Sequence, residues 1–283
     1  MLLGKRIRLE RIVNRNSGRT VIVPMDHGVT VGPIEGLVDM RNMVNAVTEG
    51  GANAVLGHVG LPLYGHRQSG KDVGLILHLS GSTVWSPDPN AKMLVNTVEN
   101  AMKMGADGVS IHVNIGAASE AEMLRDLGQT SVQCMEWGMP LLAMMYTRGA
   151  KVKSESDPEA VRHAARIAAE LGADLVKVTY TGSGASFRRV VEGCPIPVLI
   201  AGGEKAETDR AVFENVRGAL DAGGAGVCIG RNVFQHRDPL RMMRAICALV
   251  HENAAVDTAE KILATSARNP RNQRGKTGPT RRR

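Results

Sequence analysis

The sequence is poor in aromatic residues and has no long apolar run. Aromatic residues make up 3% of the 283-residue chain, so aliphatic side chains and methionine have to pack its core, as suits parallel strands buried on both faces. No apolar run approaches the roughly 18 residues of a membrane-spanning helix. The N-terminus, Met1 to Arg11, lacks the apolar stretch of a secretory signal. We therefore expect a cytoplasmic protein without a membrane partner.

The cysteines and histidines show no disulfide or metal-binding pattern. The four cysteines are scattered and include no C-x-x-C pair: Cys134, Cys194, Cys228 and Cys247. They are typical of small buried residues in a reducing compartment. Four histidines that could suggest a metal have no chelating spacing: His58, His66, His78 and His112. The sequence thus predicts neither a metal nor another cofactor.

The C-terminal segment from Ser266 to Arg283 lacks acidic residues and carries seven Lys or Arg. Without these seven, 28 basic residues face 28 acidic ones, so the net charge of +7 belongs to this segment. Because such a segment buries little apolar area, we expect a disordered basic tail over residues 263–283 after one domain over residues 1–262. The neutral body has no basic, aromatic stripe, so we expect no nucleic-acid partner.

Eight apolar, β-branched runs bounded by glycine or proline recur along the chain. They span Thr20 to Gly28, Asn53 to Gly60, Gly74 to Gly81, Gly108 to Gly116, Pro140 to Gly149, Asp174 to Gly182, Pro197 to Glu204 and Gly226 to Phe234. Segments of helical period separate most of them: Leu37 to Glu49, Asn90 to Met104, Ala118 to Trp137, Asp157 to Leu171, Glu207 to Ala222 and Pro239 to Asn253. The alternation predicts a parallel α/β sheet, and eight repeats favour a single (β/α)8 TIM barrel.

Start and stop signals support this division. Asp157 and Asp238 each precede a proline, which is typical of a helix N-cap and first helical residue. Four helical segments end in glycine stops: Gly50-Gly51-Ala52, Gly105-Ala106-Asp107, Gly172-Ala173-Asp174 and Gly223-Gly224-Ala225. The connection from Leu61 to Val73 is rich in glycine, and we expect a loop there over one end of the barrel.

Polar side chains gather late in the predicted strands, where a TIM barrel builds its active site. They are Asp26, His27, His58, His112, Asn114, Tyr146, Arg148, Lys177, Thr179, Tyr180 and Arg231. Strand alternation turns Lys177 inward, with Val176 and Val178 facing the helices. Burial lowers the pKa of a lysine, and the resulting neutral amine is the nucleophile of Schiff-base chemistry. The alternative is a lysine in a structural ion pair.

Further groups near Lys177 are compatible with this chemistry. Tyr146 lies one strand away, about 4.8 Å. Its phenol can relay protons, or it can cap the barrel through a hydrogen bond to backbone. Asp26, at the end of the first strand, can deprotonate a hydroxyl or a carbinolamine, or it can act as an N-cap. The last two strands end in Gly202-Gly203 and Gly230-Arg231, in the position of the usual phosphate site of TIM barrels.

Five motifs, in order, resemble those of the archaeal-type class I aldolases: Val23 to Gly28, Met145 to Gly149, Val176 to Gly182, Ala201 to Gly203 and Gly230 to Asn232. The resemblance covers about residues 1 to 260. It implies Lys177 as Schiff-base lysine, Tyr146 as proton donor and Asp26 as proton acceptor. It implies that the sugar phosphate is held by His27, Gly28, Val29, Thr30, Thr147, Arg148, Gly202, Gly203, Gly230 and Arg231. A homo-oligomer, commonly a decamer, is also implied.

Within this family, three segments resemble the branch that uses L-aspartate 4-semialdehyde as acceptor: His112 to Gly116, Trp137 to Pro140 and Phe234 to His236. The implied donor is a phosphorylated ketose, 1-deoxy-D-threo-hexo-2,5-diulose 6-phosphate. The implied product is 2-amino-3,7-dideoxy-D-threo-hept-6-ulosonate, which leads to 3-dehydroquinate and the aromatic amino acids.

Three alternatives stay open. The first is a class I fructose-1,6-bisphosphate aldolase, which Met144 disfavours because bisphosphate aldolases of the family tend to have tryptophan at this position. The second joins L-aspartate 4-semialdehyde to dihydroxyacetone phosphate for aminohydroxybenzoate synthesis. The third is a non-catalytic barrel that binds a sugar phosphate.

Overall fold

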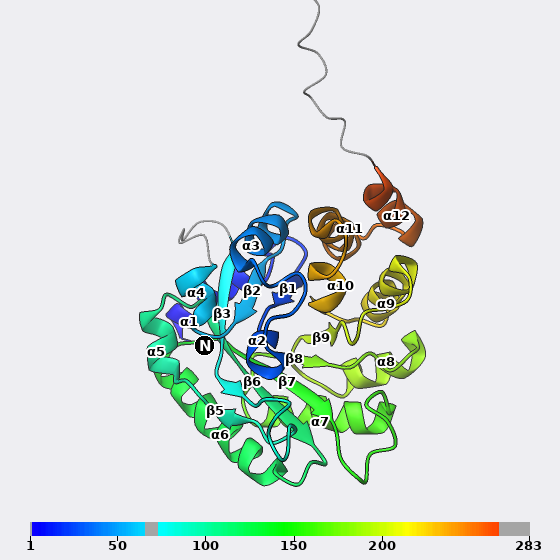
Figure 1. Cartoon of the computed structure of the whole chain (residues 1–283). Coiled ribbons are helices and arrows are strands. Elements are labelled where there is room, and N and C mark those ends of the chain that lie inside the picture. The colour runs from blue at the N-terminus through cyan, green and yellow to red at the C-terminus, as the bar shows by residue number, and fades with distance from the viewer. Residues whose placement is uncertain (1, 66–72, 266–283) are drawn as a thin grey trace, which may run out of the picture.

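The structure, a computed structural model, describes residues 2–65 and 73–265. Within these residues, eight parallel strands close into a barrel in the order β1, β2, β3, β6, β7, β8, β9, β10 (Figure 1). Their bounds are β1 Thr20–Pro24, β2 Ala54–Gly57, β3 Gly74–His78, β6 Gly108–Ile115, β7 Leu141–Thr147, β8 Leu175–Val178, β9 Val198–Ala201 and β10 Gly226–Cys228. The predicted TIM barrel is confirmed.

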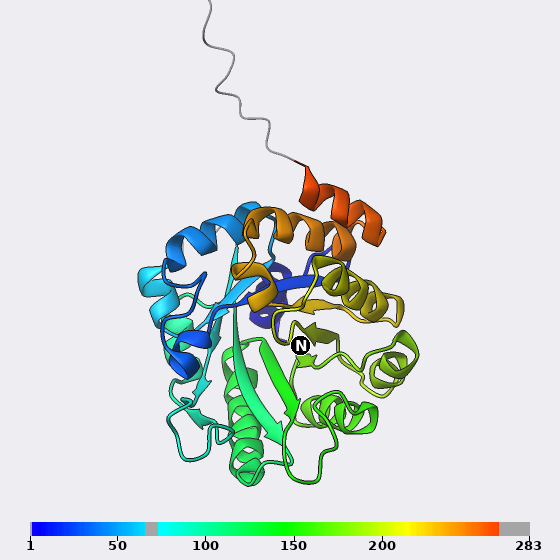
Figure 2. The same cartoon turned by 45° about the vertical axis from the view of Figure 1, so that its right-hand side comes forward.

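Helices surround this barrel (Figure 2). They are α1 Leu3–Ile12, α2 His27–Val31, α3 Met40–Glu49, α4 Gly60–Tyr64, α5 Val98–Lys103, α6 Glu120–Trp137, α7 Pro158–Glu170, α8 Gly184–Glu192, α9 Asp209–Asp221, α10 Arg231–Phe234, α11 Pro239–His251 and α12 Val256–Ala264. Asp157 and Asp238 cap α7 and α11 as the sequence predicts. Of the helices in the described ranges, none combines the length and hydropathy needed to cross a bilayer.

The helix predicted over residues 90–104 is wrong in its first half. Met93–Leu94 (β5) pairs antiparallel with Ser80–Gly81 (β4) and forms a hairpin. Helix α5 begins only after Thr97, whose side chain accepts the Asn100 N–H and so caps the helix there.

Other predicted boundaries lie close to or beyond the ends of the described residues. The connection over residues 61–73 begins with the short helix α4, while residues 66–72, including His66, lie outside the described part. Helix α12 extends to Ala264, beyond the predicted domain boundary at residue 262. Residues 266–283 of the predicted tail also lie outside the described part, so the domain division stays a prediction.

The apolar core has one layer inside the barrel and another between the barrel and the helices. The inner layer consists of Ile12, Ile22, Ala54, Leu56, Ile76, Leu142, Met144, Leu175, Leu199 and Cys228. Val176 and Val178 belong to the outer layer. Lys177, between them, therefore turns inward as predicted, in register with Met144 on β7 and Leu199 on β9.

Side chains that follow three of the glycine stops tie neighbouring strands together at the N-terminal end of the barrel. Each accepts a backbone N–H from the preceding strand at 2.7 to 2.9 Å: Asn53 from Val21, Asp107 from Leu75 and Asp174 from Leu141. Helix α1 adds cations to two of these carboxylates, because Lys5 Nζ lies 2.9 Å from Asp174 Oδ2 and Arg11 Nε lies 2.6 Å from Asp107 Oδ1. These contacts fasten α1 at this end, opposite the carboxyl ends of the strands.

Candidate active site

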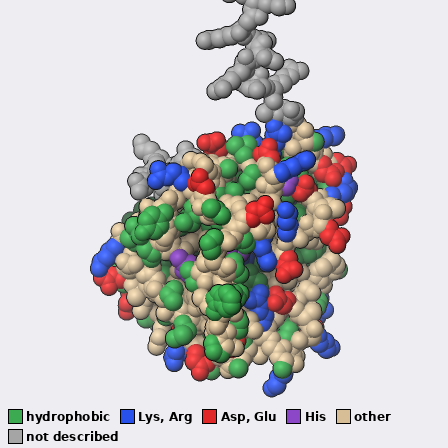
Figure 3. Space-filling model, viewed as in Figure 1, with side chains coloured by type: hydrophobic (Ala, Val, Ile, Leu, Met, Phe, Trp, Pro, Cys, Tyr) green, Lys and Arg blue, Asp and Glu red, His purple; other side chains and the backbone are tan. Residues whose placement is uncertain are grey.

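A cavity of about 300 Å³ lies at the carboxyl ends of the strands, mainly those of β8, β9 and β10. It is lined by Pro24, His27, Tyr146, Arg148, Glu155, Lys177, Thr179, Ala201, Gly202, Gly203, Glu204, Cys228, Gly230 and Arg231. In Figure 3, Lys and Arg side chains border the hollow near the centre of the face shown. The cavity thus joins the predicted lysine with the glycine-rich ends of the last two strands.

Lys177 reaches this cavity from inside the barrel and is only 5% exposed. Its Nζ lies 4.0 Å from Met144 Sδ and 5.8 Å from the centroid of the Tyr146 ring. Among the described residues, Asp26 pairs with His27 and His78 and not with Lys177. The alternative of a structural ion pair therefore has no support in this part of the chain.

The predicted direction of the Lys177 pKa shift is wrong. Burial acts to lower this pKa, as expected, but Cys228, Tyr146 and Asp26 together raise it above its usual value. Burial raises the pKa of the Cys228 thiol to about 11, so Cys228 acts as a charge only at high pH. Near neutral pH the Asp26 carboxylate favours the protonated amine, and the resting site holds an ammonium ion.

Asp26 follows β1 at the N-cap position of α2, but its side chain makes no capping hydrogen bond. Its oxygens face two histidines instead: Oδ2 lies 3.8 Å from His78 Nε2, and Oδ1 lies 3.7 Å from His27 Nδ1. Burial acts to raise the pKa of Asp26, but His78, His27 and Lys177 lower it well below its usual value. Asp26 is therefore an ionised carboxylate at the mouth of the barrel and not a helix cap.

His78, at the end of β3, was considered in the sequence only as a metal ligand. It is 3% exposed, and its Nδ1 lies 2.8 Å from Ser110 Oγ on β6. Burial lowers the pKa of His78 to about 4, so its imidazole is neutral at physiological pH. Its position late in a strand is the signal that selected His58 and His112, and the same rule applied to β3 finds it.

Two neighbours hold the ring of Tyr146. The His112 ring centroid lies 4.8 Å from that of Tyr146, and the Arg148 guanidinium lies 4.7 Å from the Tyr146 centroid. Both neighbours are themselves anchored: His112 Nε2 lies 2.8 Å from Asn114 Oδ1, and Arg148 Nε donates to Glu155 Oε1 at 2.6 Å. These contacts orient the phenol toward the end of β8, where Lys177 lies.

The ten predicted substrate-binding residues divide between the cavity wall and its surroundings. The cavity is lined by six of them: His27, Arg148, Gly202, Gly203, Gly230 and Arg231. Gly28, Val29 and Thr30 lie on α2 outside this lining, and the Thr147 hydroxyl donates to the Glu155 carbonyl at 3.1 Å. All ten roles stay predictions.

The end of β10 brings a potential anion-binding group close to β1. A Cβ at Gly230 would lie 2.8 Å from the Pro24 carbonyl oxygen, so glycine permits this approach. The adjacent Arg231 has a buried Nε without a hydrogen-bond partner among the described residues. Its guanidinium also lies 3.9 Å from Glu204 Oε1. Arg231 therefore has donor capacity left for an anion.

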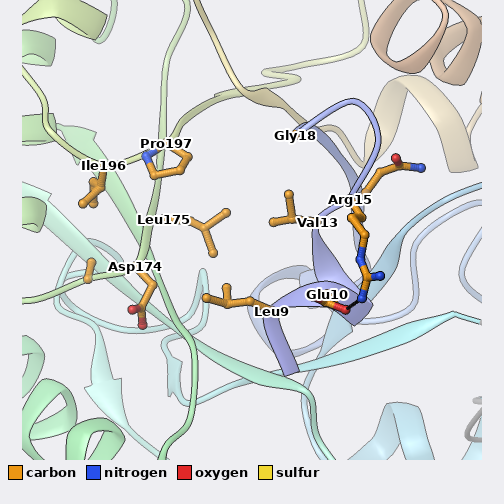
Figure 4. A pocket seen from close by; sticks show the side chains of 11 residues that line it. Leu9, Glu10, Val13, Arg15, Gly18, Asp174, Leu175, Ile196 and Pro197 are labelled. Carbon is orange, nitrogen blue, oxygen red and sulfur yellow. Dashed lines mark hydrogen bonds and ion pairs between the residues drawn. The ribbon is translucent and has the colours of Figure 1, made fainter. Parts of the chain in front are cut away.

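A larger cavity of about 510 Å³ lies at the opposite end of the barrel (Figure 4). Apolar side chains such as Leu9, Val13 and Leu175 line it, with the ion pair of Glu10 and Arg15 beside them. None of the predicted catalytic residues lines it. Because the reacting groups of TIM barrels lie at the carboxyl ends of the strands, we assign the candidate active site to the smaller cavity.

Comparisons with known proteins agree with the family resemblance. A sequence model of the DeoC/LacD family aldolases matches residues 20–236. The chain is 44% identical over 256 residues to 2-amino-3,7-dideoxy-D-threo-hept-6-ulosonate synthase from Halobacterium salinarum, with 90% of this chain and 95% of the relative covered. It is 39% identical over 250 residues to 2-amino-4,5-dihydroxy-6-oxo-7-(phosphonooxy)heptanoate synthase from Streptomyces griseus, with 88% and 91% covered. A solved archaeal fructose-1,6-bisphosphate aldolase, with its catalytic lysine bound to a carbinolamine intermediate, matches at a TM-score of 0.80 and 32% identity, covering 87% of this chain and 99% of that one.

Proposed function

This chain belongs to the DeoC/LacD aldolase family, and from that premise we propose that Lys177 forms the Schiff base of its reaction. The proposed reaction transfers a carbon unit from 1-deoxy-D-threo-hexo-2,5-diulose 6-phosphate to L-aspartate 4-semialdehyde and gives 2-amino-3,7-dideoxy-D-threo-hept-6-ulosonate. The observation that carries the proposal is a buried lysine at the cavity, with Tyr146 and Asp26 acting on its amine. A cytoplasmic location and a homo-oligomer belong to the same proposal.

The raised pKa of Lys177 is compatible with this role. An iminium carries its positive charge at the place where the ammonium carried it, so the groups that stabilise the ammonium also stabilise the iminium. The amine has to lose a proton before it can attack, and we assign Asp26 as the carboxylate that accepts it. The positive charge of Lys177 acts to lower the pKa of Asp26 and so favours the carboxylate.

Tyr146 and Asp26 carry the protons of the proposed reaction. Lys177 Nζ adds to the C2 ketone of the donor, and Tyr146 gives a proton to the carbinolamine hydroxyl, which leaves as water. The proton that Asp26 took from the ammonium then passes to Tyr146, so Asp26 is a carboxylate again before the C–C bond breaks. The C3–C4 bond then breaks, its electron pair moves into the enamine, and Asp26 takes the proton of the C4 hydroxyl as the phosphorylated aldehyde departs. The enamine attacks the aldehyde carbon of the acceptor, Asp26 returns its proton to the new hydroxyl, and water hydrolyses the iminium.

The end of the cavity near Arg231 favours a second candidate, in which dihydroxyacetone phosphate supplies the retained unit. The Streptomyces relative is named for a product with a phosphonooxy group at C7, on the carbon that the donor unit contributes. Gly203, Gly230 and the free Nε of Arg231 offer backbone and guanidinium donors for such a phosphate.

Borohydride trapping and product analysis separate the two candidates. With the hexodiulose phosphate, the adduct trapped after cleavage lacks phosphorus, because the phosphate leaves with the departing aldehyde, and only an adduct of the uncleaved donor keeps it. With dihydroxyacetone phosphate, every adduct keeps phosphorus. We expect the heptulosonate product, detected by mass spectrometry, only when the hexodiulose phosphate and L-aspartate 4-semialdehyde are both present. If dihydroxyacetone phosphate gives a product with the semialdehyde and the hexodiulose phosphate does not, this result supports the second candidate. Cleavage of fructose 1,6-bisphosphate without reaction of the semialdehyde contradicts both.

A further inference from the structure

Lys92, next to β5, is a buried cation with unused hydrogen-bond donors. It is 9% exposed, and its Nζ donates one hydrogen bond, to Ser82 Oγ at 2.5 Å. An ammonium group has three N–H donors; no Asp or Glu in the described ranges lies within ion-pair distance of Lys92 Nζ, although Asp26 and Asp88 act on it from farther away. Buried lysines are rarely left without a charged partner. The unused donors therefore point to an anionic ligand.

The hairpin of β4 and β5 holds Lys92 against the side of the active site formed by β6. Asn114 Nδ2 donates to the Asn90 carbonyl at 2.7 Å, two residues before Lys92. At the start of the hairpin, Ser80 Oγ accepts the His112 N–H at 2.9 Å. His112 in turn lies against the Tyr146 ring. These bonds place the hairpin beside the proposed proton donor.

Electrostatic effects also connect Lys92 with the site. Burial is the main cause of the lowered pKa values of His112 and His58, and the positive charge of Lys92 lowers both further. Burial and Arg148 lower the pKa of Lys92 itself, while Asp26 acts to raise it. Lys92 does not line the cavity that holds Lys177, and the hydrogen bonds of its hairpin region go to His112 and Asn114 on β6.

Both candidate reactions of the proposed function need a second anion site. The products for which the two relatives are named carry a carboxylate and a 2-amino group, at the end that the acceptor aldehyde contributes. In L-aspartate 4-semialdehyde this carboxylate is three bonds from the aldehyde carbon. When the aldehyde carbon of the acceptor reacts with the enamine beside Tyr146, the acceptor carboxylate needs a cation to bind it. This cation has to differ from the group that binds a phosphate of the retained unit.

We propose that Lys92 binds the carboxylate of the amino-acid aldehyde acceptor. This inference rests on the proposed function and names the group that selects its acceptor. It holds for either donor, because the acceptor is the same in both candidate reactions.

The test compares two acceptors with one donor: L-aspartate 4-semialdehyde, and propionaldehyde, which lacks the carboxylate. For Lys92→Met we expect kcat/KM for the semialdehyde to fall about 10- to 100-fold, the effect of losing a hydrogen bond to a charged group. The value for propionaldehyde should stay within about twofold, because it makes no use of the cation. Any effect of Lys92 on the donor cancels in the ratio of the two values. Lys92→Arg should keep part of the preference.

Lys103→Met is the matched control, since Lys103 is exposed on α5 and paired with Glu99; its ratio should equal that of the wild type. If Lys92→Met does not fold, Lys92→Gln, which keeps a donor for Ser82, replaces it. An unchanged ratio in the Lys92 variant, or an equal loss with both acceptors, overturns the inference. A wild-type enzyme that leaves the semialdehyde unreacted contradicts the proposed function instead.

Discussion

His78 should make the stability of this protein depend on pH between 6.5 and 4. Its side chain is 3% exposed, and burial lowers its pKa from 6.5 to about 4 in the folded protein. In this interval the unfolded chain binds a proton that the folded chain does not, so the free energy of unfolding falls as the pH falls. The difference amounts to about 2 kcal/mol at pH 5 and approaches about 3 kcal/mol below pH 4. Above pH 6.5 both states hold a neutral imidazole and the effect vanishes.

Urea denaturation at pH 7 and pH 5, for the wild type and for His78→Gln, measures this contribution. Burial also lowers the pKa of other histidines, so the wild type alone gives their sum: His27, His58, His112 and His251. The glutamine variant removes only the contribution of His78 to this sum and retains an amide that can form a hydrogen bond with Ser110. We expect the wild type to lose about 2 kcal/mol more than the variant between the two pH values. Equal losses refute the reasoning that His78 is neutral in the folded protein.

Three further substitutions test other parts of the account. Tyr146→Phe should lower kcat and the rate of borohydride trapping on Lys177 together by about 10²- to 10⁴-fold, the usual contribution of a positioned acid; a variant that traps substrate at the wild-type rate contradicts the role of Tyr146 in iminium formation. Asp26→Asn removes a carboxylate that favours the ammonium form of Lys177, so the rise of the trapping rate with pH should move to lower pH, and an unmoved profile would show that the carboxylate has no such effect. Lys5→Met should lower the free energy of unfolding, measured by urea denaturation, by about 3 kcal/mol, because it leaves the carboxylate of Asp174, whose side chain is 13% exposed, without its cation. The double variant Lys5→Met with Asp174→Asn should recover most of that loss. A single variant as stable as the wild type argues against the contact.

Local sequence signals predicted much of the fold. Glycine stops and Asp-Pro starts divided the chain correctly because helix caps depend on a few adjacent residues. Alternation in β8 sufficed to turn Lys177 inward between Val176 and Val178, since the side chains of a strand point to opposite faces. For the same reason, position late in a strand selected Asp26 and Tyr146, although nothing yet tests their roles.

Properties that depend on closure of the barrel were beyond sequence reasoning. The pKa of Lys177 is raised by Cys228, which no local pattern places beside β8 because it comes from β10. The segment that holds Lys92 has helical periodicity, yet hydrogen bonds from Asn114 and to Ser80 keep it in the hairpin region over β6. In both cases contacts distant in sequence outweigh the local signal.

Peptide mapping after borohydride reduction in the presence of donor tests the central claim most directly. Two lysines belong to the candidate site: burial lowers the pKa of Lys92, whereas the pKa of Lys177 is raised. Reactivity of the free amine alone therefore favours Lys92. Because Lys177 lines the cavity beside Tyr146 and Lys92 does not line it, we predict that the reduced adduct lies on the peptide that contains Lys177. An adduct on Lys92, or no adduct on either lysine, contradicts it.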